Sequence, residues 1–186
     1  IKEVSLGNDG NISLKNLTNC INNDLANNYG NLCQRVFAFI NKNCDSKIPS
    51  LGKIEKEDKK LNDEIIESIS DLRNLIDNQD LNQYLKKVIN ISFNANKYFN
   101  DQKPWSLKDK NPDRMNTILY TILNQIRSIS VLLNPIIPIA TEKVLKTLSI
   151  EKANINLESL KNTKKLKPGI KLKKTDILFK KIENDN

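Results

Sequence analysis

The chain has 186 residues, enough for one domain or one domain with an appendage. Its apolar runs fall far short of the ~20 residues that span a bilayer, and no signal-peptide pattern opens it. The absence of histidine excludes Ser-His-Asp and Cys-His nucleophilic catalysis, and there is no glycine-rich phosphate loop. Because the first residue is Ile1 and the only methionine is Met115, we expect a piece of a longer protein.

Cysteine usage and charge point to a reduced setting and a basic tail. Cys20, Cys33 and Cys44 are odd in number and have no histidine beside them, which argues against a disulfide framework and against zinc and favours the cytoplasm. The net charge is +8, but residues 161–181 hold nine lysines against one acid, Asp176, so the remainder is neutral, with 21 basic and 21 acidic residues. These lysines are Lys161, Lys164, Lys165, Lys167, Lys171, Lys173, Lys174, Lys180 and Lys181.

The first 43 residues predict an extended piece and a long helix. Residues 1–12 end in an Asn-Asp-Gly turn. From Ser13, a good N-cap, apolar residues recur at steps of three, four or seven to about Lys42. Gly30 inside this helix costs about 1 kcal/mol relative to alanine, and either the close approach of a neighbour or chance explains it. At ~100° per residue, the helix carries one polar flank, formed by Asp24, Asn28, Asn31, Arg35 and Lys42.

Four more helices follow. A loop with Pro49 and Gly52 precedes an apolar pattern from Leu61 to Ile76, and Asp80 then caps a helix that closes at Pro104. The connection "DQKPWSLKDKN" carries the only tryptophan, Trp105. Asn111, Pro112 and Asp113 start a fourth helix, which Pro135 stops, and a short fifth follows Pro138. Ile177, Leu178, Phe179 and Ile182 form an apolar hook at the end. The expected fold is all-α, an antiparallel bundle of about five helices with the basic tail packed back on it.

Four stretches in this order give the chain a resemblance to a known family. They are "INNDLANNYGNLCQR", "ANKYFNDQKPWSL", "LLNPIIPIATEKV" and "LFKKIE", and their order and spacing resemble the C-terminal, anticodon-binding helical domain of methionyl-tRNA synthetases. The resemblance covers nearly the whole chain. It departs at Lys180 and Lys181, which replace the proline and arginine of the usual LFPRIE ending. It implies residues 1–12 as the end of a connective region, 13–150 as the bundle and 151–186 as the tail.

The resemblance also implies a function and three site residues. In that family an asparagine and an arginine four apart, with a tryptophan after the third helix, recognise the CAU anticodon of methionine tRNA, and the matching positions are Asn31, Arg35 and Trp105. The partners implied are the anticodon loop of tRNA(Met) and the catalytic half of the parent ligase, which uses ATP and Mg²⁺. The HIGH-like and KMSKS-like catalytic segments and the zinc-knuckle cysteines are absent from these residues, so we expect this piece alone to be inactive.

Two alternatives stay open at this point. The chain is also compatible with the anticodon-binding domain of another class I synthetase, and with a helical interaction module that has no RNA role. The tail lysines are interpreted mainly as a solvated face, with contacts to tRNA phosphates as the alternative. Cys33 lies off the polar flank and is interpreted as a packed thiol.

Overall fold

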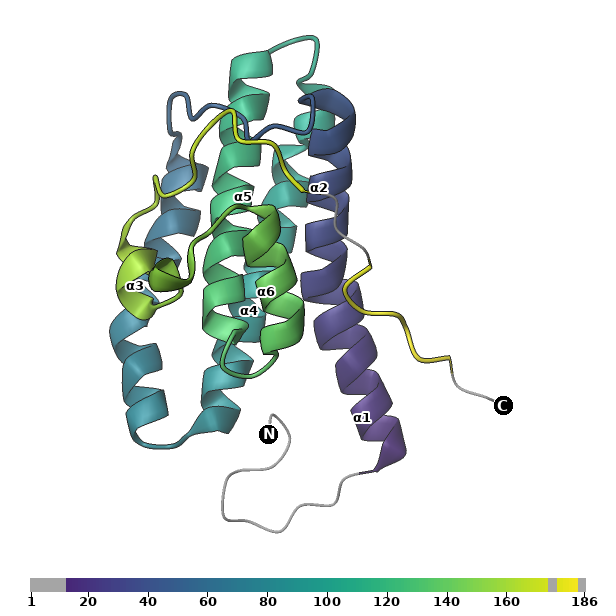
Figure 1. The fold of residues 1–186 in the computed structure, drawn as a ribbon, viewed down its shortest axis with the longest axis vertical. Helices are drawn as coiled ribbons and strands as arrows, with labels where there is room; N and C mark the ends of the chain where they lie inside the picture. Colours follow the sequence, from purple (N-terminus) through teal and green to yellow (C-terminus); the bar gives the residue numbers. More distant parts are fainter. Residues whose placement is uncertain (1–12, 174–176, 184–186) are drawn as a thin grey trace.

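The computed structural model describes residues 13–173 and 177–183, and within them the chain is a helical bundle (Figure 1). Apart from one isolated antiparallel bridge between Lys47 and Lys171, these residues contain no β structure. The expected all-α bundle is therefore confirmed. Its elements are α1 (Leu14–Cys20), η1 (Ile21–Gly30), α2 (Asn31–Asn43), α3 (Lys56–Asp77), α4 (Leu81–Gln102), η2 (Pro104–Ser106), α5 (Pro112–Leu133), α6 (Pro138–Thr147), η3 (Lys152–Asn154) and η4 (Leu157–Lys161). The expected extended piece at 1–12 lies outside the described residues.

The predicted first helix is continuous from α1 to α2, but its middle is not α-helical. η1 is a π-helix of ten residues, in which each N–H binds the carbonyl five residues earlier. At its end the Asn31 N–H bonds the carbonyl of Ala26. Because a π-turn holds more residues than an α-turn, the prediction at ~100° per residue was wrong here. Asp24 and Asn28, which the prediction placed on one polar flank with Arg35, are buried, at 7% and 1% exposed.

Polar contacts attach η1 to α4 and α5. Asn28 Oδ1 accepts hydrogen bonds from Ser92 Oγ at 3.0 Å and from Asn96 Nδ2 at 2.8 Å, and its Nδ2 donates to the carbonyl of Ile89 at 3.3 Å. The hydroxyls of Tyr29 and Ser130 lie 2.7 Å apart. Buried polar groups that are fully bonded in this way fix one packing arrangement. The register of the first helix against its neighbours is therefore set by residues that directly precede Asn31 in the chain.

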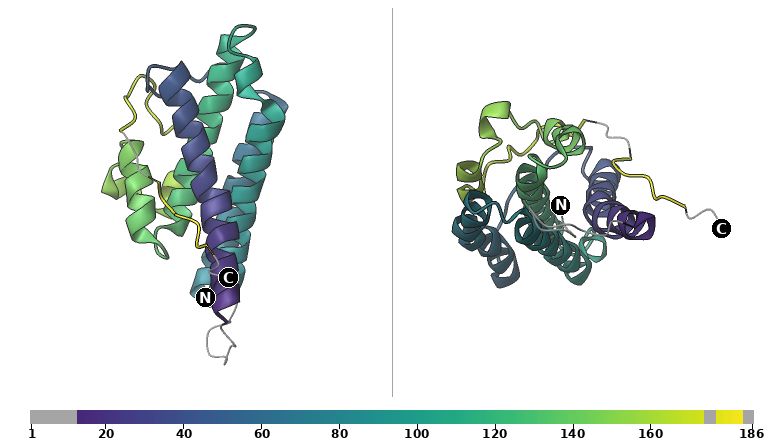
Figure 2. Two further views of the ribbon diagram at one scale, coloured as in Figure 1. Left: turned by 90° about the vertical axis from the view of Figure 1, so that its right-hand side faces the viewer. Right: turned by 90° about the horizontal axis from the view of Figure 1, so that it is seen from below.

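The helices alternate in direction, and α5 forms the centre (Figures 1 and 2). α5 packs against α2, α3, α4 and α6, and nearly all of its residues from Met115 to Leu133 are buried. It is thus buried on more sides than the single apolar stripe predicted from sequence, and the additional buried sides include polar residues such as Asn124, Gln125 and Arg127. By contrast, the start of α1 projects beyond the bundle in Figure 1, and Leu14 and Leu17 are exposed.

The helix starts follow the capping signals in the sequence. Asn111 and Asp80 cap α5 and α4 by accepting from the N–H groups of Arg114 and Gln83. α3 begins at Lys56, earlier than the predicted pattern, because Glu55 and Asp58 form a reciprocal capping box. Of these caps, Asn111 defines the end of the connection that carries Trp105, which begins after Gln102.

The segments after α6 return to the bundle. η4 packs on α3 and α5, and the fully buried Arg127 of α5 donates to the carbonyls of Ser159 at 3.2 Å and Asn162 at 3.1 Å. Of the expected hook, Leu178 and Phe179 pack on the core, whereas Ile177 and Ile182 are exposed. Asn22 pairs with the main chain of Ile182 through two hydrogen bonds of 2.9 Å.

No helix in the described part of the chain combines the length and the hydrophobicity that crossing a membrane requires.

Candidate nucleic-acid interface

Arg35 and Trp105 are brought together by Phe99 of α4. The guanidinium carbon of Arg35 lies 5.2 Å from the centre of the Phe99 ring. Trp105 packs against the same ring edge-to-face, with centroids 5.7 Å apart and an interplanar angle of 78°. Arg35 Nη2 also donates to Asn100 Oδ1 at 2.8 Å. We call Arg35, Phe99, Asn100 and Trp105 the Arg35–Trp105 cluster.

Local structure explains why these side chains meet at the surface. α4 and the helix formed by α1, η1 and α2 run in the same direction, and α2 and α4 diverge toward the end that carries the 103–111 connection (Figure 2). Phe99 is 2% exposed and is part of the core. Trp105 lies in η2, directly after α4, and remains 45% exposed. The core therefore ends in an aromatic ring on which both polar and aromatic surface groups rest.

Asn31 lies one helical turn before Arg35, at the first residue of α2. Four residues advance about 6 Å along an α-helix and return to nearly the same face. Asn31 is partly exposed, and its carboxamide has no hydrogen-bond partner among the described residues. Both its donor and its acceptor are therefore available to a ligand.

The sequence interpretation missed two members of the cluster. Phe99 is buried in the core, and its ring also supports Arg35 and Trp105, a second role that the apolar pattern of its helix did not indicate. Asn100 was not singled out. The signal was its position beside Phe99 in "ANKYFNDQKPWSL", next to the residue that packs on Trp105.

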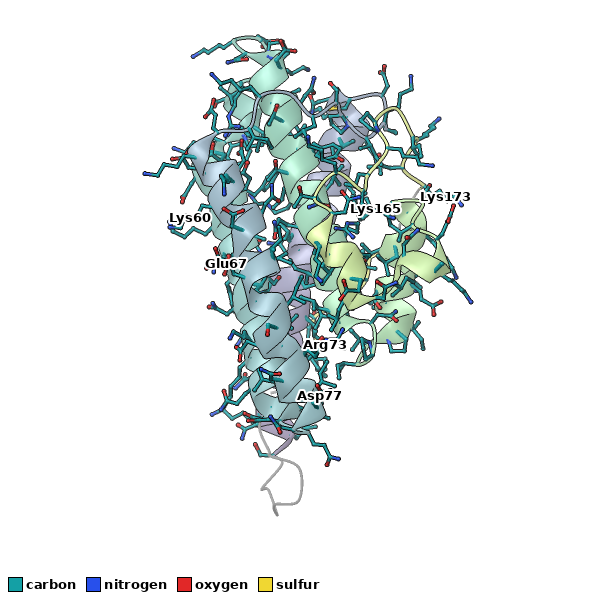
Figure 3. All side chains as sticks on the ribbon, turned by 90° about the vertical axis from the view of Figure 1, so that its left-hand side faces the viewer. Lys60, Glu67, Arg73, Asp77, Lys165 and Lys173 are labelled. Atoms are coloured by element: carbon teal, nitrogen blue, oxygen red, sulfur yellow. The ribbon has the colours of Figure 1, made fainter. Side chains whose placement is uncertain are left out.

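A separate cleft and several charged residues lie outside the Arg35–Trp105 cluster. A cleft of about 740 Å³ between α3 and α4 is lined by intermixed lysines and acids and includes none of the predicted site residues. The outward face of α3 carries Lys60, Glu67, Arg73 and Asp77, and the tail segment after α6 carries Lys165 and Lys173 (Figure 3). α2 is on the far side of the bundle from η4 (Figure 2). The basic residues near η4 thus do not border the Arg35–Trp105 cluster.

The structure also describes the three cysteines and the candidate metal-ligating side chains. Among the described residues no group of three or more His, Cys, Asp or Glu side chains could hold a metal ion. None of Cys20, Cys33 and Cys44 forms a disulfide in the described part of the chain. Cys33 is fully buried, as its interpretation as a packed thiol predicted, and burial raises the pKa of its thiol well above the usual range.

Comparison with known proteins assigns the family. Residues 48–186 match the family model described as the anticodon binding domain of methionyl tRNA ligase. The chain belongs to this family. That assignment decides against the alternatives of another class I synthetase and of an interaction module without an RNA role.

The relatives also cover residues 1–47, where Asn31 and Arg35 lie. The chain is 35% identical over 191 residues to a methionine–tRNA ligase of Rickettsia felis, which aligns with 100% of this chain and 37% of the relative. It is 35% identical over 184 residues to the methionine–tRNA ligase of Thermotoga maritima, covering 98% of this chain and 29% of the relative.

Solved structures match the fold over nearly the whole chain. The apo form of Mycobacterium tuberculosis methionyl-tRNA synthetase superimposes with a TM-score of 0.91 at 28% identity, covering 98% of this chain and 37% of that one. The same enzyme bound to methionyl-adenylate gives a TM-score of 0.90 at 29% identity, over 96% of this chain and 36% of that one. The chain thus spans about a third of the length of its relatives.

Proposed function

We propose that this domain binds the CAU anticodon loop of methionine tRNA, with Asn31, Arg35 and Trp105 contacting its unpaired bases. The observation that carries the proposal is the convergence of Arg35 and Trp105 on the Phe99 ring. Sequence-specific RNA recognition favours unpaired bases, which stack on aromatic rings and are read along their Watson–Crick edges. A half-exposed indole and a guanidinium that contact the same ring supply both kinds of contact.

Each side chain has a distinct role in this proposal. Trp105 meets Phe99 edge-to-face and offers exposed ring surface for one base. Arg35 uses one nitrogen for Asn100 and keeps further donors of its planar fork for a base edge or a phosphate. Asn31 offers a donor and an acceptor, which together discriminate one base edge from another.

The whole protein is proposed to be a cytoplasmic methionine–tRNA ligase that attaches methionine to tRNA(Met) with ATP and Mg²⁺ in protein biosynthesis. The chemistry would belong to a catalytic half with which this domain is joined, because the domain contains neither the catalytic segments nor a group of metal ligands in its described part. The isolated domain is therefore expected to form no methionyl-adenylate. ATP–pyrophosphate exchange by the domain alone would contradict this assignment.

The test is a titration of labelled stem-loops that carry CAU or another anticodon, followed by fluorescence anisotropy. Trp105→Ala should lose about 1–3 kcal/mol of stacking, which corresponds to about 5- to 150-fold weaker binding of the CAU loop. Ile139→Ala, at an exposed apolar residue of α6, is the control and should bind like the unmodified protein. If Trp105→Ala binds the CAU loop as tightly as the control, the proposal is wrong.

Arg35→Lys distinguishes base reading from charge attraction. Lysine keeps the charge but loses the planar fork. If Arg35 contacts a base edge, Arg35→Lys should reduce the preference for CAU over other loops. If it contacts a phosphate, the variant should bind each loop about as tightly as the unmodified domain does.

A further inference from the structure

The turn that carries Trp105 is short and leaves α4 through a left-handed residue. α4 ends at Gln102, and Lys103 follows with φ +44° and ψ +57°. This region costs a residue with a side chain about 1–2 kcal/mol. Ser106 N–H then bonds the carbonyl of Lys103 at 2.9 Å to form η2. A turn with this strain needs interactions that hold it in place, because other conformations lie close in energy.

One buried arginine connects the two ends of this turn. Arg114, in the first turn of α5, is 9% exposed, and its Nη2 donates to Gln102 Oε1 at 2.8 Å. The same guanidinium forms a two-pronged pair with Asp58 of α3, including an Nη2–Oδ1 bond of 2.9 Å. Its backbone N–H is bonded by Asn111 Oδ1 at 3.1 Å. Since main chain and side chain of Arg114 are both fixed, it is a rigid anchor for the end of α4.

We propose that Gln102 is a positioning residue for the anticodon-binding surface. By accepting from Arg114, it fixes the last turn of α4 relative to the start of α5 and so holds the Pro104–Ser106 turn, with the Trp105 ring packed on Phe99. It touches no base itself. Its effect on RNA binding rests on the proposed function of Trp105, but its effect on the orientation of the ring does not.

The experiment uses Trp105 as its own reporter, because it is the only tryptophan in the chain. Gln102→Met keeps a similar length and removes the acceptor. In the free domain we expect a shifted emission maximum and stronger quenching by acrylamide, and with the CAU stem-loop at least 5-fold weaker binding. Gln102→Glu, whose carboxylate accepts from Arg114 more strongly, should restore both. Gln83→Met, at an exposed glutamine near the start of α4, is the matched control.

The outcomes separate this inference from the proposed function. If Gln102→Met leaves emission and quenching unchanged, or if Gln102→Glu fails to restore them, Gln102 does not position the turn. If the ring environment changes but CAU binding does not, the positioning role in RNA binding is overturned. If Trp105→Ala itself has no effect on binding while Gln102→Met alters emission, the proposed function fails and the positioning of the ring stands. Should the methionine variant unfold, Gln102→Ser removes the same acceptor without adding apolar bulk.

Discussion

Asp58→Asn tests whether the buried ion pair at the end of the bundle stabilises the fold. The Asp58 side chain is fully buried and accepts from Arg114, from the Tyr98 hydroxyl and, at 2.8 Å, from the Glu55 N–H. Asparagine keeps the shape but has one acceptor oxygen, and its NH₂ group would face these donors. Removing one partner of a buried pair costs about 3–5 kcal/mol. Because one oxygen remains, we expect the lower end, about 3 kcal/mol.

Thermal and urea unfolding at pH 7 measure this loss. For a chain of this size, 1 kcal/mol corresponds to about 2–4 °C, so the melting temperature should fall by about 6–12 °C. Asp63→Asn, in a surface pair with Lys59 on the same helix, is the control and should cost less than about 1 kcal/mol. A loss below about 1 kcal/mol for Asp58→Asn would refute the reasoning.

The pH dependence gives an independent check of the same pair. Burial alone would raise the pKa of Asp58, but hydrogen bonds from Arg114, Tyr98 and the Glu55 N–H outweigh it and lower the pKa below the ordinary value of 3.8. A carboxyl whose pKa is lowered in the folded state stabilises above its unfolded pKa and loses that contribution as the pH falls through the folded pKa. The difference in free energy of unfolding between the unmodified domain and Asp58→Asn should therefore have its full value above about pH 5. It should shrink as the solution is acidified below pH 3.8.

Two further predictions concern the first helix. A Cβ at Gly30 would lie 3.0 Å from Phe179 Cδ2 and 3.0 Å from the Leu25 carbonyl oxygen. Gly30→Ala should therefore displace the tail ring and speed tryptic cleavage at Lys180, and unaltered cleavage would contradict this. Because burial raises the pKa of the Cys33 thiol, Cys33 should resist a thiol reagent at pH 8 until the domain unfolds, and peptide mapping that finds it modified in the native state would contradict this.

The helices were predictable because their signals are local. Asn111, Pro112 and Asp113 gave the start of α5, and Asp80 gave the cap of α4, through contacts within one turn of the chain. The π-helix was not predictable in this way. Within it Asn28 bonds Ser92 and Asn96, which are 64 and 68 positions away, and no local pattern carries that information.

The resemblance named Asn31, Arg35 and Trp105 as the candidate site, and their contact with RNA stays a prediction. Spacing placed two of them on one helix, but Arg35 and Asn100 are 65 positions apart, so their contact follows only from the packing of α4 beside η1. That packing also gives Phe99 two roles, since one ring fills the core, lies under the guanidinium and supports the indole. The geometry proposed to read the anticodon therefore depends on the same side-chain packing that stabilises the bundle. A substitution that loosens the core at Phe99 should weaken RNA discrimination without touching RNA.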